Sequence, residues 1–393
     1  MGSYLTEVAA RLVAFDTVSE RSNVAAIDYL ADRLEGHGFR VAVQRFEVAG
    51  VEKANLVASV GPARPGGLAI AGHVDVVPYE SQPGWTREPL RLEISGDRVY
   101  GRGASDMKIF LAQCLNAAAS LDRRSLRRPL SFLFTADEEI GSAGAALLAP
   151  RLADLLGDTP LPDFAWIGEP TSYDVCHAHK GLVRFGVVVR GRGGHSSRPY
   201  LGVNAIVVMA KIVEEIGRAQ ADLADRRSAA HGDAFSEAPY TTLNVGTIVG
   251  GTATNVIAEE ATCAVSYRPM PDMDPLGPYR EIGERLRRLD LHDYGSSTLA
   301  ASVQITEPSV VPALSSPTGT ALERALFRVL GRKTSKGALF ATDGPWLMQR
   351  GIATLICGPG ELDQAHQPNE SISRDAFENG TNVILSVAGE LCG

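Results

Sequence analysis

The sequence predicts an α/β protein in which a layered domain, built on a mixed sheet, is interrupted by an inserted α+β sandwich. Buried apolar strands alternate with helices over the first 180 residues and again near the C-terminus. Between these parts, the order β-α-β-β-α describes a self-sufficient sandwich. A length of 393 residues accommodates such a division. We place the layered domain at 1–180 and 298–393, and the insert at 181–297.

The first part begins with two helices and continues with strands separated by further helices. Ser22 or Asn23 precedes the second helix and Gly36 follows it, and these residue types are typical of helix ends. Alternating or continuous apolar runs indicate half-buried or buried strands. The expected helices cover residues 4–14, 24–35, 109–121 and 142–148, and the expected strands cover residues 40–48, 54–60, 68–71, 130–135 and 164–167.

The insert differs in texture, because its first strand leads into the glycine-rich turn 191–194 and then into a long helix. Residues 222–239 are polar, and we expect a surface loop there. The strand and helix style of the first part resumes near residue 303. The expected strands of the insert cover 182–189, 241–249 and 261–267, its helices cover 204–216 and 278–289, and the elements after it cover 303–305, 318–330 and 353–357.

Composition and charge exclude several classes of protein. The net charge is −8 and the basic residues are scattered, which disfavours a nucleic-acid-binding surface. The five cysteines include no C-x-x-C pair, so we expect neither a disulfide framework nor a thiolate zinc site, and a reducing cytoplasm fits best. No apolar run reaches about 18 residues, and residues 1–16 carry charges among their apolar positions. We therefore expect neither a membrane span nor a signal peptide.

A histidine stands where the strand 68–71 ends, in the segment AGHVDVVP at 71–78. On a strand, His73 and Asp75 point to the same face, so the carboxylate can orient an imidazole that binds a metal. A hydrogen-bonded pair without a metal explains the same pattern. Taken alone, this segment favours that simpler explanation.

A glycine-rich segment, YGRGASDMK at 100–108, leads into the helix expected from 109. Asp106 or Ser105 suits the N-cap of this helix, and Asp106 suits a metal ligand equally well. The segment lacks the third glycine and the following acid of a dinucleotide-binding fingerprint, and it is not a phosphate-binding P-loop.

Acidic residues follow two further apolar strands. Asp137, Glu138 and Glu139 come directly after one of them, and three neighbouring carboxylates repel each other unless a cation or solvent compensates them. Adjacent side chains on an extended chain face opposite ways, so Glu138 and Glu139 are expected to have different roles. Glu169 follows the strand 164–167, and His366 follows the strand 353–357. A solvated loop remains the alternative for the three acids.

The two histidines and three of the carboxylates fall at strand ends or helix starts of one layered domain, where α/β proteins place their sites. This set suits two divalent ions, zinc before others, with one carboxylate bridging them. The expected ligands are His73, Asp106, Glu139, Glu169 and His366.

These segments resemble the zinc aminoacylase and acetylornithine deacetylase family, which also contains succinyl-diaminopimelate desuccinylase and related carboxypeptidases. The resemblance rests on HVD at 73–75, GASDMK at 103–108, DEE at 137–139, GEPT at 168–171 and AH at 365–366. It implies that Asp106 bridges two metal ions, that His73 and Glu169 complete one site, and that Glu139 and His366 complete the other. It further implies that Glu138 is the general base and that Asp75 supports His73.

The insert adds three residues to the resemblance. His195, in GGHSSRP at 193–199, matches a histidine that reaches the active site of a partner subunit and helps to hold the oxyanion, which implies a homodimer. Asn255 and Arg268 match positions that grip the substrate carboxylate, a task that suits an arginine fork. Without the resemblance, His195 reads as an exposed histidine and Arg268 as part of a surface ion pair.

The resemblance implies a small-molecule substrate, an N-acyl amino acid, whose amide bond is hydrolysed. Several stretches look most like the acetylornithine deacetylase branch, which points to N-acetylornithine, cleaved to ornithine and acetate by a zinc enzyme, with cobalt as the alternative metal. Asp343, which could attract a basic side chain or cap a helix, follows the desuccinylase pattern instead, and Ile109 replaces a glycine frequent in the family. Desuccinylase, dipeptidase or carboxypeptidase activity therefore stays open. A metal-binding regulatory relative is disfavoured, because the base and all five ligands remain.

Overall fold

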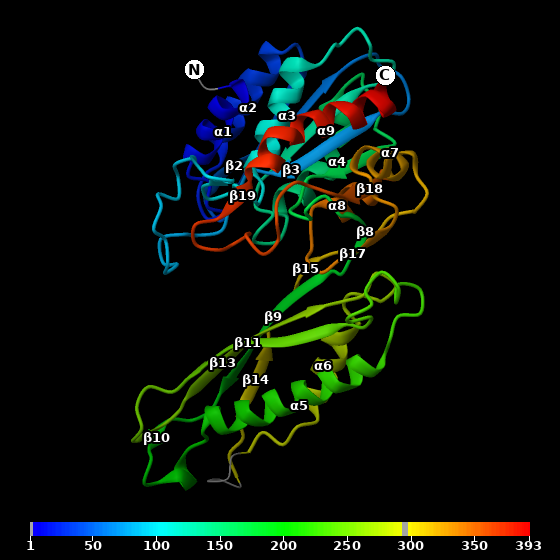
Figure 1. Ribbon diagram of the computed structural model, residues 1–393. Helices are drawn as coiled ribbons and strands as arrows, with labels where there is room; N and C mark the ends of the chain where they lie inside the picture. Colours follow the sequence, from blue (N-terminus) through cyan, green and yellow to red (C-terminus); the bar gives the residue numbers. More distant parts are fainter. Residues whose placement is uncertain (1–2, 293–297) are drawn as a thin grey trace. The chain divides into compact units, whose positions relative to one another are not determined.

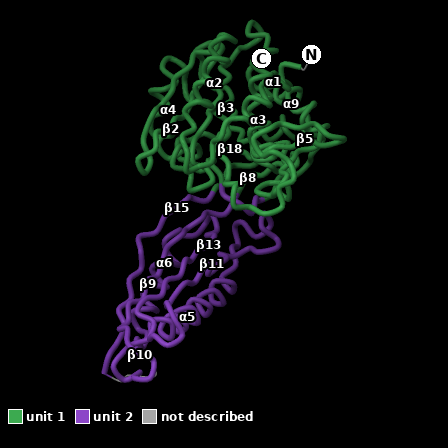
Figure 2. The backbone as a smooth tube through the Cα atoms, turned by 90° about the vertical axis from the view of Figure 1, so that its left-hand side faces the viewer, with its two compact units in different colours: residues 1–178, 314–336, 342–393 green, residues 179–313, 337–341 purple. Residues whose placement is uncertain are grey.

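The computed structural model describes residues 3–292 and 298–393 (Figure 1). The chain forms two compact units (Figure 2). The first comprises the chain up to Ala178 together with residues 314–336 and 342–393, and the second comprises residues 179–313 and 337–341. The first contains a large mixed sheet and the second a separate antiparallel sheet, so the predicted fold class is confirmed.

The sheet of the first unit runs in the order β1-β2-β6-β3-β7-β18-β8-β16, and β17 pairs with β8. Strands β6, β3, β7 and β18 are mutually parallel, whereas β1 and β2 are antiparallel to their neighbours. The strands are β1 (Arg40–Val48), β2 (Val51–Val60), β3 (Leu68–His73), β6 (Leu130–Thr135), β7 (Phe164–Ile167), β8 (Val175–His179), β16 (Leu314–Ser315), β17 (Ser335–Ala338) and β18 (Ala353–Ile356). A small sheet in the order β19-β5-β4 joins β4 (Glu93–Ser95), β5 (Arg98–Tyr100) and β19 (Ser371–Ser373).

Helices cover the large sheet in layers. Helices α1, α3, α9 and α7 pack side by side in one layer, and α4 packs against α8 and β2 (Figure 1). Alternate residues of the strands serve different layers: Ile70 and Phe132 join the main core cluster, whereas Ala71 and Leu133 do not. The helices are α1 (Tyr4–Ala14), α2 (Val24–Gly36), α3 (Lys108–Ser120), α4 (Ala143–Leu156), α7 (Ala321–Leu330), α8 (Gly344–Met348) and α9 (Arg374–Cys392).

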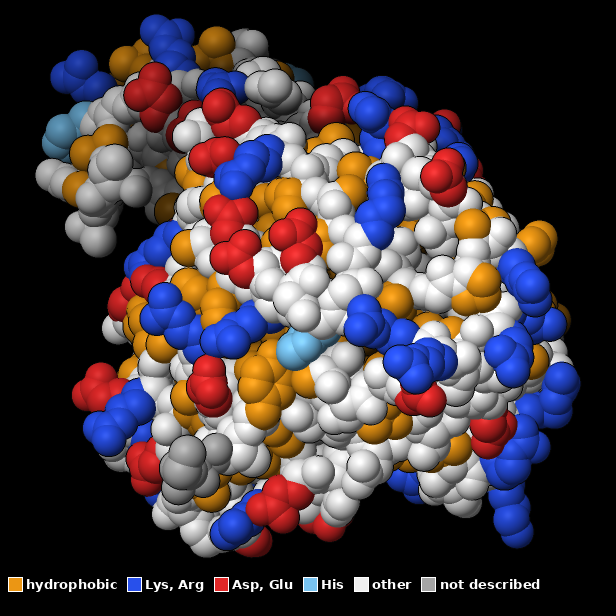
Figure 3. All heavy atoms as spheres, turned by 90° about the horizontal axis from the view of Figure 1, so that it is seen from above, with side chains coloured by type: hydrophobic (Ala, Val, Ile, Leu, Met, Phe, Trp, Pro, Cys, Tyr) orange, Lys and Arg blue, Asp and Glu red, His pale blue; other side chains and the backbone are white. Residues whose placement is uncertain are grey.

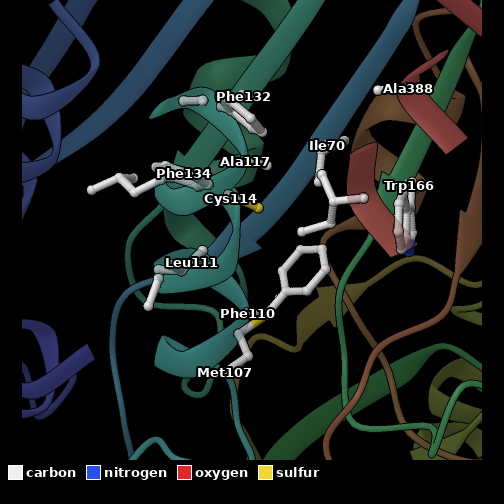
Figure 4. Packing of buried hydrophobic residues seen from close by; sticks show 14 of the residues in the cluster. Ile70, Met107, Phe110, Leu111, Cys114, Ala117, Phe132, Phe134, Trp166 and Ala388 are labelled. Atoms are coloured by element: carbon white, nitrogen blue, oxygen red, sulfur yellow. The ribbon is translucent and has the colours of Figure 1, made fainter. Parts of the chain in front are cut away.

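The main core lies between α3 and the sheet. Figure 4 shows Phe110 of α3 directed towards Ile70 of β3 and Trp166 of β7. The rings of Phe110 and Trp166 meet edge to face, with 5.7 Å between their centroids, and the Trp166 indole donates to the carbonyl of Cys357. This packing fixes α3, which begins at the last residue of the glycine-rich segment, against β3 and β7.

Helices α4 and α9 of the first unit depart from the expectation drawn from the sequence. Helix α4 continues through Pro150 to Leu156, although the sequence predicts an end at 148. Helix α9 was not expected, although Ser373 accepts a hydrogen bond from the Ala376 amide as an N-cap and Asp375 lies in the first turn. Among the described residues, no helix combines the length and apolar composition that crossing a bilayer requires.

The second unit packs two helices on an antiparallel sheet in the order β11-β13-β9-β14, with β15 also pairing with β9. Helix α5 begins after Asn204, whose side chain accepts from the Ile206 amide, and runs well past the expected end at 216. The elements are β9 (Leu182–Arg190), α5 (Ala205–Asp225), β11 (Thr242–Gly250), β13 (Glu260–Arg268), α6 (Gly277–Arg287), β14 (Ser302–Ile305) and β15 (Ser309–Val311). A short ribbon pairs β10 (Gly194–His195) with β12 (Val256–Ile257), and a 3-10 turn covers Pro199–Leu201.

The boundary between the insert and the last part of the chain requires a correction. The expected boundary at residue 297 itself lies outside the described residues. The strand at 303–305, which the sequence assigns to the last part, instead belongs to the second unit, because β14 pairs with β9 through Val303 and Val189. β15 pairs with the beginning of β9, where Val311 is opposite Leu182, and the second unit therefore continues to Ala313.

Candidate metal centre

The candidate ligands of the first unit follow strands that end at the same edge of the sheet. β3, β6 and β7 are parallel neighbours, and their carboxyl ends lead to His73, to Glu138 and Glu139, and to Glu169. The loops that follow parallel strands lie at the same end of the sheet, beyond the carboxyl ends of the strands. Asp106 precedes α3, and His366 lies in the segment between β18 and β19.

The Asp106 carboxylate lies between the two histidines. Its Oδ1 is 3.0 Å from Nε2 of His73, and its Oδ2 is 3.4 Å from Nε2 of His366. The same nitrogen of His366 is 3.0 Å from Oε1 of Glu139, while Nε2 of His73 is 3.9 Å from Oε1 of Glu169. Each oxygen of one carboxylate thus faces a different imidazole. The five residues expected to bind metal are brought together in this way.

Within the described residues, two overlapping groups of side chains have ligand atoms close enough to share an ion: His73, Asp106 and Glu139, and His73, Glu138 and Glu169. The Glu169 Oε1 atom is buried and has no hydrogen-bond partner. A buried carboxylate oxygen without a partner is costly unless a cation compensates it. The site therefore has the donor chemistry that a divalent ion requires.

The imidazole of His73 is oriented with its Nε2 towards the carboxylates of the cluster. Its Nδ1 is 3.0 Å from the carbonyl oxygen of Asp75 and donates to it, which leaves Nε2 facing the carboxylates. Burial disfavours the charged ring, but the hydrogen bonds to Asp106 and Asp75 outweigh it and raise the pKa of His73. The side chain of His73 is 1% exposed and that of His366 is 50% exposed, so the His366 end of the cluster borders solvent.

The acids of the cluster have opposite pKa shifts. Burial and repulsion by Glu169 hold the pKa of Glu138 well above its usual range, and burial together with Asp106 does the same for Glu169. For Asp106, burial is outweighed by the hydrogen bonds to His366 and His73, which lower its pKa. Hydrogen bonds to Asp106 and Glu139 raise the pKa of His366 to about 10. These carboxylates favour a positively charged occupant of the space between them.

Asp75 contacts more than the neighbouring histidine. Its Oδ1 accepts from the Glu138 amide at 3.1 Å, and its Oδ2 accepts from the Glu139 amide at 3.2 Å and from the Ser19 hydroxyl at 2.7 Å. The carboxylate therefore fixes the backbone of Glu138 and Glu139, two of the three acids that follow β6. Asp75 is also 3.5 Å from Nδ1 of His73 through Oδ1.

A buried lysine supports the same loop and was missed by the sequence analysis. Lys53 of β2 donates to Oδ1 of Asp137 at 2.7 Å, to the Arg21 carbonyl at 2.8 Å and to the Ser19 carbonyl. Both side chains of the Lys53 and Asp137 pair are at most 2% exposed. Asp137 has a φ of 58°, in the left-handed region, so this pair holds the turn that presents Glu138. A lone lysine in a strand pattern carries no sequence signal for such a role.

Asp343 is buried at the N-cap position of α8, but its side chain makes no capping hydrogen bond. It accepts a hydrogen bond from the Thr135 hydroxyl at the end of β6. Burial raises the pKa of Asp343 to about 6, and its charge in turn raises the pKa of Glu138. Asp343 therefore belongs to the electrostatic surroundings of the cluster.

The three candidate residues of the insert lie at two separate places in the second unit. His195 and Asn255 are exposed and neighbouring, because β10 pairs with β12 and the Ser196 amide donates to the Asn255 carbonyl at 3.1 Å. Nδ1 of His195 is 2.8 Å from the Ser197 hydroxyl. Arg268 stands at the opposite end of β13, next to the Pro269 carbonyl that accepts from the Gly181 amide. The structure thus groups His195 with Asn255, and it does not group Arg268 with them.

This fold, with histidines and carboxylates converging at the strand ends of a mixed sheet, defines a metal-dependent hydrolase. The chain belongs to the peptidase family M20/M25/M40, whose profile matches residues 69–390. The family resemblance noted in the sequence is thereby confirmed. A curated relative, acetylornithine deacetylase from Yersinia pseudotuberculosis, is 35% identical over 96% of this chain and 94% of its own length.

Two solved structures show the same fold. An M20 family metallo-carboxypeptidase from Sulfolobus solfataricus superposes with a TM-score of 0.78 at 20% identity, covering 99% of both chains. Human carnosine dipeptidase 1 superposes with a TM-score of 0.73 at 17% identity, covering 98% of this chain and 95% of that one. At these identities, the likeness concerns the fold alone.

Proposed function

We propose that this protein hydrolyses the amide bond of N-acyl amino acids at a two-metal site, and that its substrate is N-acetylornithine, which gives ornithine and acetate. The observation that carries the proposal is the position of the Asp106 carboxylate, whose two oxygens face the imidazoles of His73 and His366. The choice of substrate is supported by the name and the 35% identity of the Yersinia relative.

The donor set fits two zinc ions, with cobalt as the alternative. We assign His73 and Glu169 to one ion, His366 and Glu139 to the other, and Asp106 to both. Imidazole and carboxylate ligands suit zinc, and the unpartnered Oε1 of Glu169 is an oxygen that a cation would satisfy. Two such ions would act as Lewis acids, polarising the amide carbonyl and lowering the pKa of water.

Glu138 is the proposed general base. Burial first, and then repulsion by Glu169, raise the pKa of Glu138, so it holds a proton more readily than an exposed glutamate does. Glu138 takes a proton from the attacking water as the oxygen bonds to the acyl carbon. It then donates that proton to the amine nitrogen as the carbon–nitrogen bond breaks. Asp75 orients this base, because it accepts the hydrogen bond from the Glu138 amide.

The substrate's two ends call for different partners. The negative charge of Asp343, near the acids of the cluster, would attract the basic side chain of ornithine, and Arg268 and Asn255 would bind its carboxylate. The sequence TDG at 342–344, which follows the desuccinylase pattern, favours N-succinyl-diaminopimelate as the second candidate substrate. Dipeptide hydrolysis is the third candidate.

A homodimer would resolve the separation of the substrate-binding residues. From Glu260 to Arg268, β13 spans about 26 Å, so the end near Asn255 and the end at Arg268 cannot touch one small molecule in the same second unit. We propose that His195 and Asn255 act at the site of a partner copy, where His195 would stabilise the oxyanion. In support, β11 stands at the edge of the described sheet, and Ile248 and Val249 on it are 57% and 68% exposed.

The proposal is tested by one paired measurement on the purified protein. Metal content is determined by elemental analysis, and hydrolysis of N-acetylornithine, N-succinyl-diaminopimelate and a set of dipeptides is compared at equal concentrations. We expect two divalent ions per chain and the highest kcat/KM for N-acetylornithine. A preference for another substrate would correct the specificity alone. Two bound ions without hydrolysis of any substrate would indicate a regulatory relative, and failure to bind metal would refute the proposed chemistry.

A further inference from the structure

A carboxylate outside the proposed ligand set binds the segment that carries Asp106. The side chain of Glu370 is 1% exposed. Its Oε1 accepts from the amides of Ser105 at 2.9 Å and Asp106 at 3.0 Å, and its Oε2 accepts from the Gly103 amide at 3.0 Å and from Arg102 Nη1 at 2.8 Å. Both oxygens are thus occupied by donors from one short segment.

This arrangement is costly to bury unless every donor is present. A buried carboxylate is tolerated when it is paired and hydrogen-bonded, and removing one part leaves the others uncompensated. Charge-assisted hydrogen bonds are also shorter and stronger than neutral ones. The amide of Asp106 therefore has a fixed position relative to Glu370.

The same cluster extends to the second histidine. Arg102 is fully buried and donates to Oε1 of the Gln82 side chain, and Nε2 of the same side chain donates to the carbonyl of His366. The Arg102 guanidinium lies over the ring of Trp85, 5.0 Å from its centroid, and Trp85 donates to the same oxygen of Gln82 at 3.1 Å. A chain of contacts thus joins Glu370 to the backbone of His366.

The first unit uses this device twice. Asp75 accepts from the amides of Glu138 and Glu139, and Glu370 accepts from the amide of Asp106. In both cases a carboxylate that is not a proposed ligand holds the main chain of a residue that is, Glu139 in the first case and Asp106 in the second. The contacts of Asp75 lie beyond the ends of β3 and β6. The contacts of Glu370 join the start of α3 to the segment after His366.

We propose that Glu370 is a positioning residue for the metal centre, which fixes Asp106 through its backbone and ties it to His366 through Arg102 and Gln82. This inference rests on the proposed ligand set. Glu370 sets the distance between the carboxylate of Asp106 and the imidazole of His366. It touches neither the ions nor the substrate. The ligand geometry, and with it the metal affinity, depends on the Glu370 carboxylate.

The test compares Glu370→Gln with Glu323→Gln in the metal-free protein. In Glu370→Gln one oxygen is replaced by an NH2 group, which cannot accept from the donors that face it. Glu323 is a matched control, because it is also buried, accepts from the Gly319 amide and the Ser335 hydroxyl, and has no described contact with the metal centre. Cobalt(II) and zinc are titrated separately, and the visible absorption of the cobalt form is recorded.

We expect Glu370→Gln to weaken cobalt and zinc binding by about 10- to 100-fold and to change the cobalt absorption band, as loss of a ligand-orienting partner does. Glu323→Gln should keep the wild-type affinity and spectrum even if both variants unfold at lower temperature. Wild-type affinity and spectrum in folded Glu370→Gln would overturn the proposal, because a purely structural role changes stability only.

A second variant decides the outcome if Glu370→Gln does not fold. Gln82→Ala removes the half-buried link to His366, and it is expected to weaken binding of one of the two cobalt equivalents while leaving the other. In that case, unchanged binding in Gln82→Ala would overturn the proposal. Failure of the wild-type protein to bind either metal would instead refute the proposed function, which keeps the two outcomes distinct.

Discussion

The two units place their functional candidates in opposite settings. In the first, the proposed ligands surround one carboxylate, and Asp75 and Glu370 hold the backbone around them. In the second, His195 and Asn255 lie exposed on a ribbon of two short strands. On the face shown in Figure 3, acidic and basic side chains of the described residues alternate over the surface and form no large patch of one sign. The comparison shows that the proposed metal ligands are held together within one chain before anything binds. The candidates for substrate binding, His195 and Asn255 on one side and Arg268 on the other, are not held together within one insert.

The sharpest test of the preorganised region is Glu138→Gln. Because Glu138 moves the proton but is not a proposed ligand, the variant should bind two metal ions and lose about 10²- to 10⁴-fold in kcat. The measurement combines elemental analysis with hydrolysis of N-acetylornithine, and the exposed substitution Glu35→Gln serves as the control. Turnover at the wild-type rate would remove Glu138 from its proposed role.

The support beneath the cluster is tested by Lys53→Met. Breaking a buried ion pair by removing one partner costs about 3–5 kcal/mol, since Asp137 is left buried without its cation. The control is Lys336→Met, whose pair with Asp174 is exposed and should contribute at most about 1 kcal/mol. Urea unfolding followed by circular dichroism measures both, and equal losses in the two variants would contradict the expectation.

The exposed region is tested by His195→Ala. If His195 stabilises the oxyanion, kcat should fall by about 10²- to 10³-fold, whereas His292→Ala, in the same unit, should leave it unchanged. Mixing subunits separates action within one chain from action between chains. A dimer of one His195→Ala and one Glu138→Gln subunit regains one complete site only if His195 serves its partner. Absence of recovered activity in verified mixed dimers would argue against that role.

The smallest expected effect concerns pH and a buried histidine of the second unit. Burial lowers the pKa of His179 to about 4, against roughly 6.5 in an unfolded chain. Between these values the unfolded state binds more protons, so stability rises with pH across the window and the contribution is complete above about 6.5. His179→Gln should therefore reduce the dependence of unfolding on pH between 4 and 6.5 by up to roughly 3 kcal/mol. Parallel pH profiles of the variant and the wild type would contradict this.

Much of the layered domain could be predicted from the sequence, because its signals are local. Apolar runs marked β3, β6 and β7, and the polar residues directly after them identified the segments that the structure brings to Asp106. The association of β14 with β9 could not be predicted in this way, because strand pairing depends on partners more than one hundred residues apart.

The supporting residues were hidden for a similar reason. Lys53 and Glu370 act on segments far away in the chain: Lys53 on Asp137, and Glu370 on the amides of Ser105 and Asp106. Charged residues in sequence usually indicate solvent exposure, and only the fold reveals that these two are buried and compensated. Their roles follow from tertiary contacts rather than from spacing.

The pairing of Leu182 with Val311 has a consequence for how such proteins diversify. Because these residues are opposite each other on adjacent strands, their Cα atoms are only about 5 Å apart. The beginning and the end of the long segment 179–313 of the second unit are therefore neighbours. A short bridge of a few residues would span that gap. Genetic exchange can therefore replace or delete the segment between these two residues without changing the order of β3, β6 and β7 in the large sheet.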